Sequence, residues 1–111
     1  MWQVKKSGLF IRQWKHFALD YKERAGIEVA GRFIDAVEQA LDFISENPLS
    51  CSPYSPGADY EDLLQYEFRK WTLKKFPHSI FFRTANNNTI LIETIYAHKM
   101  DIIGRFPKDV S

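Results

Sequence analysis

The sequence predicts a single α+β domain in which two helices pack on one face of a small antiparallel sheet. Two amphipathic helical patterns occupy the first half of the 111-residue chain, and three strand-like segments follow in the second half. A short N-terminal strand completes the expected order: strand, helix, helix, strand, strand, strand. A chain of this length suits one domain, so residues 1–111 are assigned to a single unit.

The first half of the chain has the pattern of a strand followed by a helical hairpin. A strand is expected at Trp2–Lys6, with Ser7 as the N-cap of the next helix. That helix is expected to end near Ala25-Gly26, and the second helix at Asn47-Pro48, because proline cannot continue the hydrogen-bond ladder. The first helix carries an aromatic stripe: Phe10, Trp14, Phe17 and Tyr21. The second carries an aliphatic and aromatic stripe: Ile27, Ala30, Phe33, Ile34, Val37, Leu41 and Ile44.

The second half changes to strand periodicity after a proline-rich loop at residues 48–59. Asn86-Asn87-Asn88 is a hairpin turn, since asparagine tolerates the left-handed backbone conformation. A further turn is expected at Phe76-Pro77. The three expected strands are residues 66–73, 79–84 and 89–97.

Composition excludes several classes of protein. With 45% hydrophobic and 26% charged residues, the chain should fold and not remain disordered. The N-terminus lacks the apolar run of a signal peptide, and no segment approaches the roughly 20 apolar residues of a membrane span. The lone Cys51 has neither metal-ligand spacing nor a partner base, and a single thiol favours a reducing compartment. We therefore expect a cytoplasmic protein without a metal or cofactor.

Charge is distributed unevenly along the chain, although the net charge is only +1. Residues 1–65 hold seven Lys or Arg and ten Asp or Glu, whereas residues 66–111 hold eight and four. This asymmetry predicts a face suited to an anionic partner, either nucleic acid or an acidic protein segment. The balance is far below that of a dedicated nucleic-acid-binding protein.

The last forty residues contain a series of motifs: Phe68-Arg69-Lys70-Trp71-x-Leu73, Phe76-Pro77-His78-x-Ile80-Phe81-Phe82-Arg83, Ile90-x-Ile92 and Ile95-Tyr96-Ala97-His98. The first half adds Ala25-Gly26, Ala30-x-x-Phe33 and Glu46-Asn47-Pro48. Together these motifs resemble the RelE/ParE family of toxins, and the likeness covers nearly the whole chain. The resemblance implies the βααβββ toxin fold and a type II toxin–antitoxin system.

The resemblance also implies a partner and two alternative targets. An antitoxin encoded beside the toxin typically wraps a disordered C-terminal segment around the toxin's helices and sheet edge, giving a hetero-oligomer. Some members of the family are ribosome-dependent endoribonucleases that cut mRNA, whereas others poison DNA gyrase without catalysing a reaction themselves. A third possibility is a toxin-like fold that has lost its activity and serves as a binding or plasmid-stabilising partner.

Ribonuclease chemistry needs a base, an acid and cations around one phosphate. Under that hypothesis the possible set is Arg69, Lys74, Lys75, Arg83, Tyr96 and His98. The resemblance implies positions in the site for Arg83 and His98. The structural alternatives are an ion pair between Arg83 and Glu93 and a backbone cap formed by His98. His78 is expected at the surface of a turn, and His16 is not expected to be catalytic. The expected partner-binding residues are Trp14, Arg69, Lys70, Trp71, Lys74, Lys75, Arg83 and Lys99.

The sequence favours gyrase over the ribosome as the target. The segment His98-Lys99-Met100-Asp101 looks more like the gyrase-directed branch of the family. A net charge of +1 is low for a protein that works against ribosomal phosphates, because each phosphate contact contributes electrostatically. No carboxylate stands beside His98 on the same strand face to act as its partner.

Overall fold

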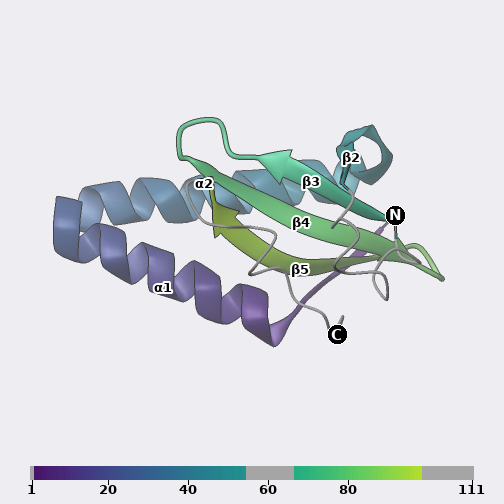
Figure 1. Ribbon diagram of the computed structural model, residues 1–111, viewed down its shortest axis with the longest axis horizontal. Coiled ribbons are helices and arrows are strands. Elements are labelled where there is room, and N and C mark those ends of the chain that lie inside the picture. The colour runs from purple at the N-terminus through teal and green to yellow at the C-terminus, as the bar shows by residue number, and fades with distance from the viewer. Residues whose placement is uncertain (1, 55–66, 99–111) are drawn as a thin grey trace.

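The computed structural model describes residues 2–54 and 67–98, which form two helices on one face of a five-stranded sheet (Figure 1). This arrangement confirms the predicted α+β class. The helical elements are α1 (Gly8–Ala25), α2 (Ile27–Glu46) and the short 3-10 turn η1 (Pro48–Ser50). The strands are β1 (Gln3–Lys6), β2 (Ser52–Tyr54), β3 (Phe68–Thr72), β4 (His78–Ala85) and β5 (Thr89–Ala97). Across the sheet their order is β1-β5-β4-β3-β2.

The sheet differs from the expected one in two respects. It is mixed, because β1 pairs with β5 in parallel while the other neighbours are antiparallel. It also has a fifth strand, since the segment expected to be a loop contains η1 and β2. Pro53 within β2 pairs with Arg69 at the sheet edge, where a missing N–H is tolerated because one side of the strand needs no partner.

Local signals set the ends of both helices as expected. The Ser7 side chain accepts a hydrogen bond from the Phe10 N–H at 2.9 Å, which caps α1. Between the helices, Gly26 adopts φ 96°, a conformation that only glycine reaches without strain. The predicted hairpin turn is also confirmed, because Asn87 and Asn88 have φ values of 64° and 53°.

The core lies between the helical hairpin and the facing side of the sheet. The α1 stripe packs there, with Phe10 fully buried and the other three rings partly buried. The α2 stripe is confirmed at Ala30, Phe33, Val37, Leu41 and Ile44, which are buried. Ile34 is only partly buried, and Ile27 is 72% exposed. Ile27 opens α2 at the tip of the hairpin, which projects beyond the end of the sheet (Figure 1), so no strand lies beneath it.

A β-bulge keeps β5 in register with the core. Phe81 pairs with Thr94 and Phe82 pairs with Ile92, which leaves Glu93 as an additional residue on β5. Strict alternation would turn Ile95 away from the helices, because residues 92 and 95 differ by an odd number of positions. The bulge resets the alternation, so Ile90, Ile92 and Ile95 all belong to the core.

The start of α1 is tied directly to β5, which yields a stability prediction. The Ser7 hydroxyl caps α1 and also donates to the Glu93 carbonyl at 2.7 Å. We expect Ser7→Ala to lower the free energy of unfolding by about 1–2 kcal/mol, measured by urea denaturation. Ser45→Ala is the control, because that hydroxyl bonds only within its own helix, to the Asp42 carbonyl. The control should change stability by less than about 0.5 kcal/mol, and equal losses would contradict the role given to Ser7.

Candidate functional site

A groove of about 650 Å³ runs between α2 and the segment from β3 to the β3–β4 turn. A groove of this size is within the range of ordinary ligand and peptide sites. Its α2 side is formed by Val29, Arg32, Asp35, Ala36, Gln39, Ala40 and Phe43. Its other side is formed by Trp71, Leu73, Lys74, Lys75 and Phe76.

The groove has an apolar floor and a positively charged rim. Phe43 of α2 and Trp71 of β3 stack against each other in the floor, with ring centroids 4.2 Å apart and planes inclined by 18°. Lys74 and Lys75 are exposed on the rim, and the α2 side adds Arg32 and one acid, Asp35. Apolar floor and cationic rim together suit an amphipathic segment that carries carboxylates.

The predicted partner-binding residues separate into distinct places. Trp71, Lys74 and Lys75 line the groove. Lys70 is exposed on β3 but alternates to the other sheet face. Trp14 lies on α1, half-buried beside Phe10 with ring centroids 6.0 Å apart, and does not line the groove. Lys99 falls outside the described residues.

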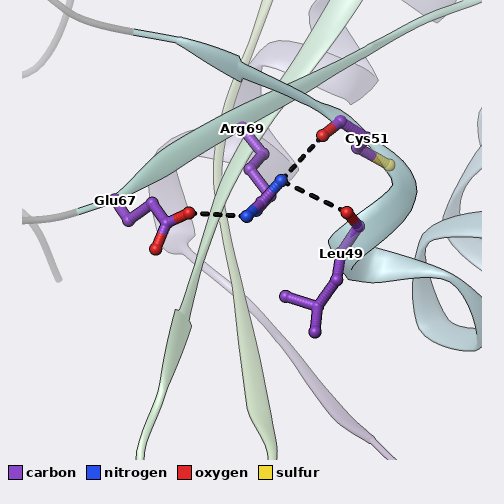
Figure 2. A network of polar contacts seen from close by, with 4 residues as sticks. All are labelled: Leu49, Cys51, Glu67 and Arg69. Carbon is purple, nitrogen blue, oxygen red and sulfur yellow. Dashed lines mark hydrogen bonds and ion pairs between the residues drawn. The ribbon is translucent and has the colours of Figure 1, made fainter.

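Arg69, predicted as a site residue, links the segment around η1 to the beginning of β3. Its guanidinium donates to the carbonyls of Leu49 and Cys51, at 3.4 and 2.8 Å, and pairs with the Glu67 carboxylate (Figure 2). These contacts leave its side chain 13% exposed. Burial raises the pKa of the neighbouring Cys51 thiol, although Arg69 acts in the opposite sense, and a protonated thiol is a poor nucleophile.

The sheet face opposite the helices carries the candidates for ribonuclease chemistry. The register places Arg83 between Phe68 and Leu91, and Tyr96 beside Ser79. Because Ser79 and Arg83 are an even number of residues apart on β4, Arg83 and Tyr96 share this face. Arg83 lies opposite Leu91 and not opposite Glu93. The expected ion pair between Arg83 and Glu93 stays a prediction.

His98 lies at one end of this face, in a chain of hydrogen-bonding side chains. Its Nε2 is 2.9 Å from the Ser79 hydroxyl, which is 3.0 Å from the Thr72 hydroxyl. Arg83 lies four residue positions beyond Ser79 on β4, so their Cα atoms are about 13 Å apart. The structure therefore brings His98 next to Ser79 and does not place Arg83 beside it.

His78 was predicted to be a surface residue of a turn, and this is wrong. It is the first residue of β4 and only 3% exposed. Its ring lies in an aromatic cage, with centroids 4.7 Å from Phe17, 5.0 Å from Phe33 and 5.9 Å from Tyr21. The turn is made one residue earlier, by Pro77, so the strand pattern begins at His78, which pairs with Ala97.

Sequence reasoning missed the α2 side of the groove. The core stripe of α2 was recognised, but a second stripe beside it was not. Val29, Ala36, Ala40 and Phe43 follow one another at spacings of seven, four and three residues, which places them along one helix face. That second apolar stripe was the available signal. The polar residues Arg32, Asp35 and Gln39 flank this stripe and also line the groove.

Two features are absent from the described ranges, 2–54 and 67–98: a membrane-spanning helix and a cluster of metal-ligating side chains. Neither of the two long helices is both long and apolar enough to cross a membrane. Nor do these residues bring three or more His, Cys, Asp or Glu side chains together as a group that could hold a metal ion.

Comparison with known proteins relates this chain to one family. The model of the family described as the ParE toxin of type II toxin–antitoxin systems, parDE, matches residues 4–102. A solved structure described as the chromosomal ParDE TA system from P. aeruginosa superimposes with a TM-score of 0.70 at 17% sequence identity. The alignment covers 87% of this chain and 96% of that one, which supports the fold. No match is found among curated proteins.

The His78 cage predicts a pH dependence of stability. Burial, followed by the electrostatic effect of the neighbouring His98, lowers the pKa of His78 from 6.5 to about 4. The folded state therefore disfavours protonation, so His78 contributes stability above pH 6.5 that is lost progressively as the pH falls toward 4. We expect His78→Phe, which keeps a ring in the cage, to flatten the decline of unfolding free energy between pH 7 and pH 5. The exposed His16→Gln serves as the control, and identical slopes for wild type and His78→Phe would refute the assignment.

Proposed function

We propose a function from one premise: this chain belongs to the ParE toxin family of type II toxin–antitoxin systems, whose model matches residues 4–102. Membership makes it the toxin component of such a system, with an antitoxin as its partner. Our proposal is that the cognate antitoxin neutralises it by placing an amphipathic segment in the α2–β3 groove. The free toxin then arrests growth by poisoning DNA gyrase.

The surface of the groove supports binding of the antitoxin there. Its floor exposes aromatic surface, including the stacked Phe43–Trp71 pair, whereas its rim is polar. Exposed apolar surface of this kind marks interaction sites in small soluble proteins. The rim cations Lys74 and Lys75 favour carboxylates on the incoming segment and disfavour a basic one.

The separation of Arg83 from His98 supports a target that requires no chemistry by the toxin. Cleavage of RNA through its 2′-hydroxyl needs proton transfer and charge stabilisation at the same phosphate. His98 is bound to Ser79, about 13 Å along β4 from Arg83, so the two do not form a direct pair. A binding surface, by contrast, requires only that complementary groups share a face.

The endoribonuclease remains the second candidate because of one observation. Arg83, Tyr96 and the Ser79 that binds His98 all lie on the sheet face away from the helices. A long RNA lying along this face would contact several of them. An inactive toxin-fold partner is the third outcome, and it predicts no growth arrest at all.

The two activities are separable with purified protein. We expect the full chain to inhibit supercoiling by DNA gyrase, or to trap cleaved DNA, while translation in a cell-free extract proceeds unchanged. His98→Ala should retain growth arrest on expression, because the gyrase hypothesis assigns no proton transfer to it. Codon-dependent cuts in mRNA on ribosomes, abolished by His98→Ala, would show that the ribonuclease alternative is correct.

The groove hypothesis predicts a charge-dependent antitoxin affinity. We expect Lys74→Glu/Lys75→Glu to weaken binding of the antitoxin encoded beside this gene by about tenfold or more, measured by calorimetry, because two attractions become repulsions. The exposed Lys22→Glu on α1 reverses charge away from the groove and should change affinity by less than about twofold. Antitoxin binding that is indifferent to the rim charges but sensitive to Lys22 would place the antitoxin elsewhere.

A further inference from the structure

The α2–β3 groove has two ends, and two ring contacts fix how its walls are ordered. Phe43 stacks on Trp71 at one end, and Phe33 meets Phe76 at the other, with ring centroids 5.3 Å apart. The wall from β3 to the turn therefore runs antiparallel to α2. Phe33 and Phe43 are ten residues apart, which corresponds to about 15 Å along a helix. The groove is thus elongated, and its ends have different surroundings.

Positive charge gathers at the Phe76 end of the groove. Lys74 and Lys75 directly precede Phe76, and Arg32 lies beside this end on α2; all three line the groove and are exposed. Among the lining residues of the described part of the chain, Asp35 is the one carboxylate, and it lies one helical turn from Arg32. Three cations around one carboxylate leave this end positive, so it attracts a single anionic head group.

The stretch between the two ends is apolar and offers a ligand few backbone partners. Ala36 and Ala40, one turn apart on α2, line it with small side chains, and Leu73 lines it from the other wall. The N–H and C=O groups of α2 are bonded within the helix, and the Leu73 N–H already donates to the His78 carbonyl at 2.9 Å. An extended peptide buried here would need partners for its own backbone groups, whereas a hydrocarbon chain needs none.

We propose that the groove is a binding site for a long-chain carboxylate, that is, a free fatty acid. The hydrocarbon tail lies along the two alanines and ends at the Phe43–Trp71 pair, and the carboxylate lies among the three cations. A volume of about 650 Å³ accommodates such a chain. The proposal does not depend on where the antitoxin binds. Where the antitoxin occupies the groove as proposed above, the two ligands compete.

The groove fits this ligand better than two others of the same charge. An anionic bilayer presents its head groups to a protein and keeps its tails inside, so it would reach the rim of the groove and not the floor. A free phosphate would pair with the cations but would leave the aromatic and aliphatic floor in water. A fatty acid uses the cations and the floor together.

The first test measures laurate binding to the full chain by calorimetry, below the concentration at which laurate forms micelles. We expect one laurate per chain, and affinity about tenfold or more weaker in Lys74→Glu/Lys75→Glu, because two attractions become repulsions. Lys5→Glu/Lys6→Glu makes the same change in net charge at exposed positions of β1. This control should change laurate affinity by less than about twofold.

The second test varies the apolar part of the interaction without changing the charge of the protein. Ala36→Trp places a ring in the middle of the groove and should weaken laurate binding about tenfold or more, whereas Leu19→Trp on exposed α1 should not. Each methylene added between hexanoate and laurate should tighten binding roughly threefold. Dodecyltrimethylammonium, which has a comparable tail and a cationic head, should bind about tenfold or more weakly than laurate.

Methyl NMR of the wild-type chain provides a readout that no variant can obscure by unfolding. On titration with laurate, the methyl signals of Val29 and Leu73, which line the groove, should shift. Those of Leu19 and Leu49, 54% and 62% exposed elsewhere, report non-specific adsorption and should not shift. Equal shifts at all four residues would overturn the proposal. Unchanged laurate affinity in Ala36→Trp would do the same, as would binding of phosphatidylglycerol vesicles without binding of laurate.

Competition with the antitoxin separates this proposal from the placement of the antitoxin. Displacement of the antitoxin by laurate supports both. An antitoxin that stays bound while laurate shifts the Val29 and Leu73 methyls supports the fatty-acid site and contradicts the placement of the antitoxin in the groove. Antitoxin binding that depends on Lys74 and Lys75, with no binding of laurate, overturns the fatty-acid site alone.

Discussion

β5 is the strand on which the rest of the molecule depends, because three different elements satisfy its backbone. β4 pairs with one side along its length, and β1 pairs with the other side as far as Ile92. Beyond that point α1 replaces the missing strand: Ser7 donates to the Glu93 carbonyl, and Gln13 accepts from the Ile95 N–H at 3.0 Å. A buried backbone group without a partner is costly, so this edge fixes where α1 must lie.

The position of α1 determines where the groove forms. Strands are spaced about 4.8 Å apart, whereas a helix with its side chains is about 10 Å across, so two helices cover roughly four strands. With α1 beside β5, α2 cannot extend over the full width to β2. A strip of the helix-facing surface at β3 is therefore left uncovered beside α2, and Trp71 and Phe43 stack within it. The groove therefore follows from the width of the sheet relative to the hairpin and not from any single motif.

Local chemistry made most of the fold predictable. Ser7, Gly26 and the Asn87-Asn88 turn each specify a backbone conformation through their own side chain or its absence, and each behaves as the sequence indicates. The bulge at Glu93 and the burial of His78 were not predicted, because both depend on how β4 and β5 align against the helices. The break in alternation between Ile92 and Ile95 was the visible sign of the bulge. Of the predicted partner-binding residues, Trp71, Lys74 and Lys75 share a groove, but its α2 side depends on the packing of the two helices and was not predicted.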